Sequence, residues 1–231
     1  CPATDILGAI PTNDTANDII FLADGPYSCN IALENGEWVI GDGSSSTLAA
    51  IVAPRVTPVA GSDFAPYNTF SGTDPILNSG AGDCFTFSQD NIVRGLRVSN
   101  TAGYAFIDNG GTIGTTIVTE VNVTDAGGIL NLRNGGTINA AFETLSSTTH
   151  TGRVINLTNM AGAITSPGGG AITNAANADT IAINGGTVSL TLFSTVSKTG
   201  GTGSLLDVTG GHATGTLNFL SAISHSSATG S

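Results

Sequence analysis

Few residues of this chain have types and spacings that could do acid–base chemistry. Of its seventeen acidic residues, fourteen precede residue 126, and only Glu143, Asp179 and Asp207 lie beyond it. A pair of carboxylates spaced for general acid–base catalysis therefore cannot be placed in the second half of the chain.

The basic residues add little. Arg94 and Arg97 lie close together on an apolar run, where they could pair with Asp90 or Asp108. The three histidines fall at turns, where we expect them to be solvent-exposed: His150, His212 and His225. We therefore predict a protein that is not an enzyme, with no catalytic residue, metal site or cofactor.

Composition limits the partners. Only 10% of the 231 residues are charged, the net charge is −11, and six residues are basic. Such a chain is poorly suited to bind nucleic acid or an anionic membrane. It also has no apolar stretch long enough to span a bilayer, so we expect no membrane insertion.

The sequence contains an internal repeat, which indicates the structural elements that position the charged residues and histidines. A phrase of the type Asn-Gly-Gly-Thr, degenerate in its third copy, begins at 109, 134, 159, 184 and 209, so every step is 25 residues. The first four copies start with an asparagine: Asn109, Asn134, Asn159 and Asn184. A fixed period of this size indicates a solenoid, in which each unit buries its apolar face against its neighbours.

Residue types decide which solenoid this is. Short runs of Val, Ile, Thr and Phe alternate with Ser, Thr and Asn, and Gly or Asn breaks each run, which is typical of strands and turns. We predict an all-β fold, a single-stranded parallel β-helix with coils of about 25 residues. Five side chains are expected to point into one continuous core: Ile113, Ile138, Phe142, Leu192 and Leu217.

The corner asparagines admit two interpretations. Coils stack about 4.8 Å apart, so the four side chains could form a hydrogen-bonded ladder along one corner. Alternatively, asparagine is there because it tolerates the positive φ of a tight turn.

The predicted domain organisation has two parts. Residues 1–16 form an N-terminal cap, and residues 17–231 form the β-helix. Four prolines interrupt the repeat at 52–82, which predicts an aperiodic lateral insertion without strands. Its aromatic residues either cover a core edge or form a contact loop: Phe64, Tyr67 and Phe70.

Three cysteines match no metal-binding spacing: Cys1, Cys29 and Cys84. With a surface rich in Ser, Thr and Asn, they indicate an exported protein. A Cys1–Cys29 disulfide is favoured because these residues lie about one coil apart, and Cys29–Cys84 is the alternative.

Four segments resemble the first coils of the pectin-lyase-like right-handed β-helix superfamily: Asp24–Tyr27, Asn35-Gly36, Val39–Ser44 and Thr47-Leu48. A later segment, Asn91–Asn100, resembles another coil of the same superfamily. The resemblance implies a right-handed helix. Hydrolases of the superfamily carry an Asp-Asp pair and a Gly-His-Gly motif, both missing here, since His212 is followed by Ala213. A short match at Gly169–Ile172 resembles polymorphic outer-membrane proteins.

The chain looks most like the passenger or adhesin region of a bacterial autotransporter-type surface protein. The function expected is a stiff extracellular or cell-surface stalk, associated with the outer membrane, that mediates attachment or assembly. One alternative is a self-assembling fibre or sheath subunit, and another is a polysaccharide lyase, hydrolase or tailspike. Expected partners are a host surface or glycan, more of a longer chain, or a second copy stacked head to tail, since we expect that residue 231 is not a natural end.

Overall fold

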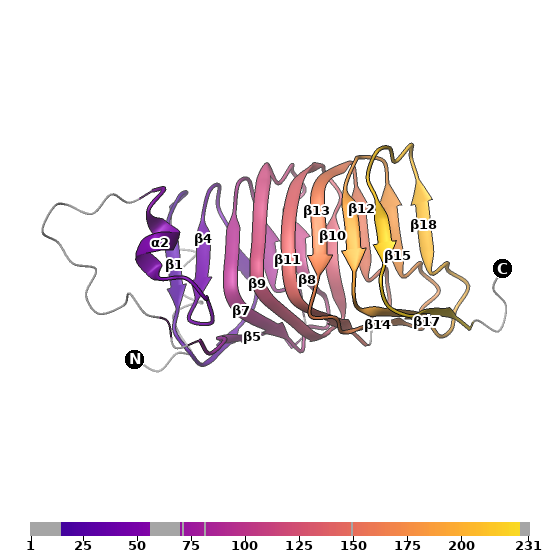
Figure 1. Ribbon diagram of the computed structural model, residues 1–231, viewed down its shortest axis with the longest axis horizontal. Coiled ribbons are helices and arrows are strands. Elements are labelled where there is room, and N and C mark those ends of the chain that lie inside the picture. The colour runs from indigo at the N-terminus through magenta and orange to yellow at the C-terminus, as the bar shows by residue number, and fades with distance from the viewer. Residues whose placement is uncertain (1–14, 56–69, 71, 81, 149, 227–231) are drawn as a thin grey trace, which may run out of the picture.

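The computed structural model describes residues 15–55, 70, 72–80, 82–148 and 150–226. Nearly all of the regular structure is parallel β-strand, wound into a solenoid (Figure 1). The predicted fold class is confirmed. The handedness inferred from the resemblance stays a prediction.

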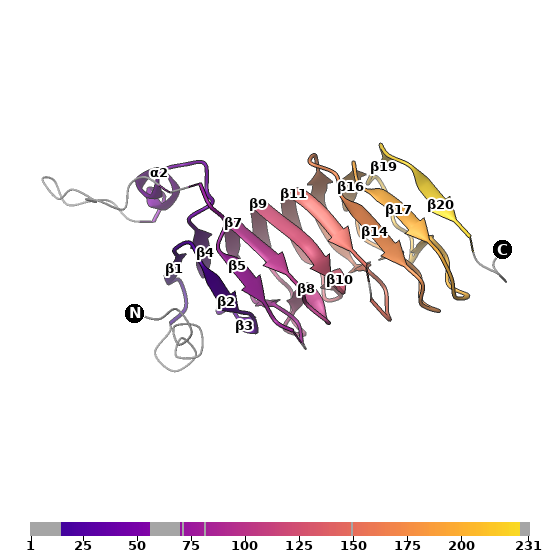
Figure 2. The same ribbon diagram turned by 90° about the horizontal axis from the view of Figure 1, so that it is seen from below.

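One sheet has thirteen strands and forms two faces of the solenoid. Its main path consists of β1 (Ile19–Leu22), β4 (Trp38–Gly41), β7 (Ile92–Ser99), β9 (Thr115–Ala126), β11 (Gly136–Ser147), β13 (Met160–Ser166), β16 (Ser189–Leu192) and β19 (Leu217–Phe219). The adjoining face consists of β2 (Pro26–Ser28), β5 (Ile76–Asn78), β14 (Ala171–Asn174), β17 (Thr195–Lys198) and β20 (Ile223–His225) (Figure 2).

The second sheet has seven strands and closes the remaining side. It consists of β3 (Ile31–Ala32), β6 (Phe85–Phe87), β8 (Tyr104–Asp108), β10 (Gly128–Leu132), β12 (Ile155–Thr158), β15 (Ile181–Asn184) and β18 (Leu206–Thr209). Here the repeat length holds closely: Leu130 pairs with Ile155 and Ile181 with Leu206, both 25 residues on.

In the middle coils, one bent strand spans two faces of the solenoid, whereas in the other coils two separate strands do so. β7, β9 and β11 each run across two faces as one strand, and the bend in β7 falls at Gly95, whose φ is +67°. A Cβ there would lie 2.5 Å from the backbone nitrogen of Ser44, so this position requires glycine. β9 bends beside it at Glu120, whose φ is +54°.

A single apolar core fills the solenoid. Phenylalanine rings stack through its centre, with centroids 5.5 Å apart for Phe85–Phe106 and 5.3 Å for Phe87–Phe106. Four of the five predicted core residues are at most 1% exposed: Ile113, Ile138, Phe142 and Leu192. The fifth, Leu217, is half-buried at the last coils and packs against this core.

A smaller apolar cluster lies on the outer face of the first coils, against residues that flank the insertion. α2 (Leu48–Val52) packs Val52 onto Trp38 and Ile40, and Arg55 lies over the Trp38 ring at 4.1 Å. Thr47 begins the helix because its hydroxyl accepts from the Ala50 amide.

The segment 52–82 differs from the expectation of a strandless insertion. β5 lies within it and pairs with both β2 and β7, because its prolines precede the strand and leave its amides free to pair. Phe70 stacks on Phe21 with centroids 5.5 Å apart, so it belongs to the outer apolar cluster. Phe64 and Tyr67 lie outside the described residues, as does the segment 1–14.

The disulfide joins Cys29 to Cys84, the alternative pairing, so the favoured Cys1–Cys29 bond is not the one formed. The reason is the insertion, which lengthens one coil so that residues far apart in sequence become neighbours in space. The Asn30 and Ile31 amides both donate to the Cys84 carbonyl, which fixes this register between the two coils. Cys1 lies outside the described residues.

Candidate functional site

A groove of about 410 Å³ lies beside α2 on the outer face of β4, β7 and β9. Its lining is mainly apolar: Trp38, Ala50, Ile51, Pro54, Ile92, Arg94, Ile117 and Thr119. Outward side chains of the three strands form the floor of the groove. Ala50 and Ile51 of α2, with Pro54 just after the helix, form its wall. Concave apolar surfaces with a few polar groups are where ligands bind most often, so this is the candidate site.

Arg94 is the charged residue of the groove, and it is held in place from two sides. Its Nε donates to Glu120 Oε2 at 2.6 Å and its Nη2 donates to Glu120 Oε1 at 3.0 Å. Nη2 also donates to Ser46 Oγ at 2.9 Å. The side chains are only 22% and 20% exposed, so a two-point ion pair of this kind is well ordered.

Glu120 also binds the turn that precedes α2. Ser44 Oγ donates to its carboxylate at 2.9 Å, and Ser45 donates through both its hydroxyl and its backbone amide. Partial burial raises the pKa of Glu120, but hydrogen bonds from Arg94, Ser45 and Ser44 outweigh it and lower this pKa to about 2. Glu120 is therefore ionised at ordinary pH and is unsuited to act as a general acid.

The Arg94–Glu120 ion pair was not predicted from the sequence. Arg94 was expected beside Asp90 or Asp108, whereas Asp90 Oδ1 accepts from the Thr115 amide and Asp108 accepts from Gly110, Arg133 and Asn134. Arg97 lies near Asp74, with Nη2 and Oδ2 3.9 Å apart. Because the strands bend at Gly95 and Glu120, strict alternation along the strand could not predict these partners.

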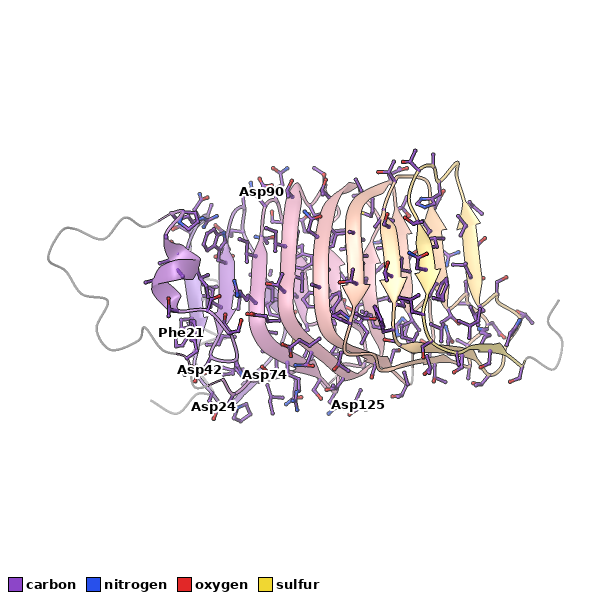
Figure 3. The ribbon with its side chains drawn as sticks, viewed as in Figure 1. Phe21, Asp24, Asp42, Asp74, Asp90 and Asp125 are labelled. Atoms are coloured by element: carbon purple, nitrogen blue, oxygen red, sulfur yellow. A yellow bond between two sulfur atoms is a disulfide. The ribbon has the colours of Figure 1, made fainter. Side chains whose placement is uncertain are left out.

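Several acidic residues lie along one side of the solenoid, outside the groove (Figure 3). Figure 3 shows Asp24, Asp42, Asp74 and Asp125 along one side of the solenoid. Asn122 Nδ2 donates to Asp74 Oδ2 at 2.9 Å and to Glu143 Oε2 at 2.7 Å, so an amide separates these two carboxylates. Within the described ranges, no group of three or more His, Cys, Asp or Glu residues could hold a metal ion.

The corner asparagines lie at the ends of strands in the seven-stranded sheet, but their described contacts are not a simple ladder. Asn134 Nδ2 donates to Asp108 Oδ1 at 2.7 Å, and Asn109 Nδ2 donates to Ser88 Oγ at 3.3 Å. The backbone amide of Asn159 donates to the carbonyl of Asn184 at 2.8 Å. The corner thus uses both the backbone and the polar side chains that happen to lie on the adjacent coil.

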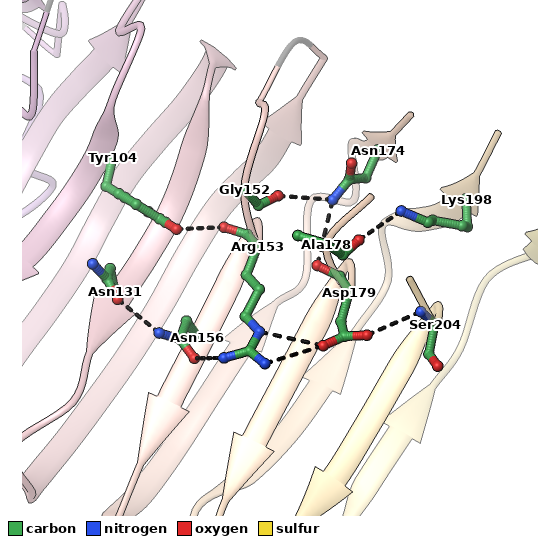
Figure 4. Close-up of polar contacts among 10 residues, drawn as sticks. All are labelled: Tyr104, Asn131, Gly152, Arg153, Asn156, Asn174, Ala178, Asp179, Lys198 and Ser204. Carbon is green, nitrogen blue, oxygen red and sulfur yellow. Dashed lines mark hydrogen bonds and ion pairs between the residues drawn. The ribbon is translucent and has the colours of Figure 1, made fainter. Parts of the chain in front are cut away.

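A second polar network covers the opposite corner (Figure 4). Asp179 accepts from Arg153 through Oδ2, at 3.3 Å from Nε and 3.2 Å from Nη2, and from the Ser204 amide through Oδ1 at 2.9 Å. Asn156 Nδ2 donates to Asn131 Oδ1 at 2.8 Å, which is an amide–amide bond between coils.

Lys198 is fully buried in this corner. Its Nζ donates to the carbonyl oxygens of Ala176 and Ala178. Burial lowers the pKa of Lys198, and the charge of Asp179 opposes that shift. These contacts close a turn and leave the ammonium inaccessible, so this corner is structural.

The histidines are less exposed than expected. His150 is half-buried with its ring edge against Tyr104, the two ring centroids being 4.5 Å apart, and burial lowers its pKa. His212 is also half-buried, and only His225 of the three is exposed. None of them lines the groove.

Comparison with protein-family models, with curated proteins and with solved structures finds no match to this chain. In the part of the chain that the structure describes, no helix is long and apolar enough to cross a membrane.

Proposed function

We propose that this chain is a structural and adhesive module of an extracellular or cell-surface protein, a stiff β-helical stalk that mediates attachment or assembly. The observation that carries the proposal is the unbroken parallel ladder from β1 to β19 around one apolar core. Such a ladder resists bending because every coil is hydrogen-bonded to the next along its length.

The disulfide supports the proposed location, and the groove supports a role without catalysis. Disulfides such as Cys29–Cys84 persist mainly in oxidising environments, which favours an exported protein. In the groove beside α2, Glu120 stays ionised and is no general acid, and Arg94 is held by it in a two-point ion pair. A polysaccharide lyase or hydrolase is therefore the weaker alternative.

Attachment is tested with beads that carry the folded chain, exposed to glycan arrays, host-cell layers and mineral or crystalline surfaces. We expect retention on at least one surface, and none for beads carrying the reduced, unfolded chain. Incubation with pectate and alginate, with and without Ca²⁺, should release no sugar product. Turnover that disappears in Arg94→Ala would contradict the proposal and favour the enzyme.

Self-assembly is a second candidate, favoured by the last described coils. Val208, Leu220 and Ile223 are 42%, 58% and 55% exposed, and among the described strands β18, β19 and β20 each pair on one side only. Unpaired strand edges with exposed apolar side chains are where another coil or a second copy can add. For a fibre subunit, we expect the apparent mass from light scattering to rise with protein concentration and to be lower in Leu220→Lys. An apparent mass that stays that of the monomer at all concentrations would reject this candidate.

A further inference from the structure

From the Ile117 and Thr119 side of the groove onward, the outer face of the solenoid carries uncharged side chains in straight columns. One column starts at Ile117 on β9 and continues through Asn139, Ala163 and Ser189, each the register partner of the one before. All four side chains are exposed or half-exposed.

A second column runs beside the first, two residues further along each strand. It consists of Thr119, Ala141, Thr165, Thr191 and Asn218, again paired residue by residue. We call the two columns together the neutral face.

Charge is excluded from the neutral face. The chain has nine charged residues between 105 and 225, and none of them lies in either column. Its borders are charged: Arg94 is the register partner of Thr119 on the preceding coil, and Glu143 lies two residues beyond Ala141. Charged side chains hold tightly bound, irregular water shells, so a face without them leaves the arrangement of its hydration water to hydroxyl, amide and methyl groups.

The spacing of the columns is close to a spacing in ordered water. Neighbouring rungs lie about 4.8 Å apart, as parallel strands do. Tetrahedral water with O···O contacts of about 2.8 Å places second-neighbour oxygens about 4.5 Å apart. Over the five rungs of the second column, the difference adds up to only about 1 Å, less than half the diameter of a water molecule.

A second copy of the chain fits the neutral face less well. Nine side chains, each covering about 4.8 Å by about 6.6 Å of the sheet, give roughly 290 Å². A stable protein interface needs about 800 Å² from each partner. A protein partner would also have to remove water from the threonine and asparagine groups, whereas an ordered water lattice keeps that water in place.

From the neutrality, register and spacing of this face, we propose that it binds the surface of ice. The threonine hydroxyls hydrogen-bond to lattice water, and the methyl groups of threonine, alanine and isoleucine lie against the open spaces of the lattice. This inference names the surface to which the attachment module proposed above adheres, and it rests on that function.

The test compares variants of the whole chain on growing ice. A dye coupled to the N-terminal amine reports adsorption, since Lys198 is the only lysine and is buried. We expect the chain to accumulate on ice and to slow ice recrystallisation. Ala163→Arg and Thr165→Arg place a long cation in the centre of the neutral face and should reduce adsorption at least tenfold.

Thr195→Arg is the matched control. Thr195 is exposed on β17, on the adjoining face of the solenoid, so its variant should adsorb like the parent chain. Circular dichroism and thermal unfolding establish that all three variants are folded.

Three results would overturn the inference: a folded parent chain that does not adsorb to ice, equal adsorption by Thr165→Arg and the parent, or a loss in Thr195→Arg as large as that in Thr165→Arg. Retention of beads on glycans or cell layers without adsorption to ice would reject this inference and leave the attachment function standing. Loss of retention on every surface would reject both.

Discussion

Cys29 and Cys84 are 55 residues apart in the chain, yet their Cα atoms are 4.6 Å apart on adjacent coils. One ordinary coil takes about 25 residues, so the remaining residues between them are the insertion and its flanks. The bond therefore closes the one coil whose length departs most from the repeat.

Removing this bond should destabilise the first coils. For Cys29→Ser with Cys84→Ser, we expect the free energy of unfolding to fall by about 2–4 kcal/mol, because the reduced chain regains the freedom of a long loop. Urea unfolding without reductant measures it. Cys1→Ser is the control and should change little; equal losses in both variants would contradict the pairing.

Glu120→Gln should loosen the turn before α2. Glutamine keeps the shape of the side chain but loses the negative charge to which Arg94, Ser44 and Ser45 donate hydrogen bonds. We therefore expect the free energy of unfolding to fall by on the order of 1–2 kcal/mol, a value kept small by the partial exposure of the pair. Chemical denaturation measures the loss, and Asp125→Asn, an exposed acid on the same strand, is the matched control.

The same carboxylate predicts a pH dependence. Its folded-state pKa of about 2 lies below the ordinary 4.5, so its contribution is fully present above pH 4.5 and is lost as the pH falls toward 2. The difference in stability between the parent chain and Glu120→Gln should therefore shrink across that window. A difference that stays constant from pH 7 to pH 2 would show that the ion pair does not stabilise the fold.

Phe142→Ala should be costly. Its side chain is fully buried beside the stacked phenylalanine rings, with its centroid 5.9 Å from that of Phe106. Removing it leaves a cavity, so we expect the free energy of unfolding to fall by about 3–5 kcal/mol. Phe193→Ala, at a residue 43% exposed, is the control and should cost far less. A thermal midpoint unchanged by Phe142→Ala would place the ring outside the core.

Lys198 should resist amine-reactive reagents. Its ammonium is buried and donates to two carbonyl oxygens, so we expect the native chain to be labelled only at its N-terminus. Labelling of Lys198 in denaturant, read by mass spectrometry of peptides, is the positive control. Rapid labelling of Lys198 in the native chain would show that this corner opens.

Periodicity accounts for the part of the fold that could be predicted from the sequence. The 25-residue step and the alternation of apolar residues were enough to predict the parallel β-helix and the burial of Ile113, Ile138 and Phe142. The Arg94–Glu120 pair could not be predicted, because that contact depends on positive φ at Gly95 and Glu120, which breaks the alternation on both strands. The cysteine pairing was open for a similar reason, since the length of an insertion hides which coils are neighbours.

The position of the disulfide also decides what a protease can do. A peptide bond cleaved anywhere from residue 30 to residue 83 lies inside the covalent ring that Cys29 and Cys84 close. Both fragments of such a nicked chain stay joined until a reductant is added, so the insertion can be cut without releasing the first coils from the rest of the solenoid.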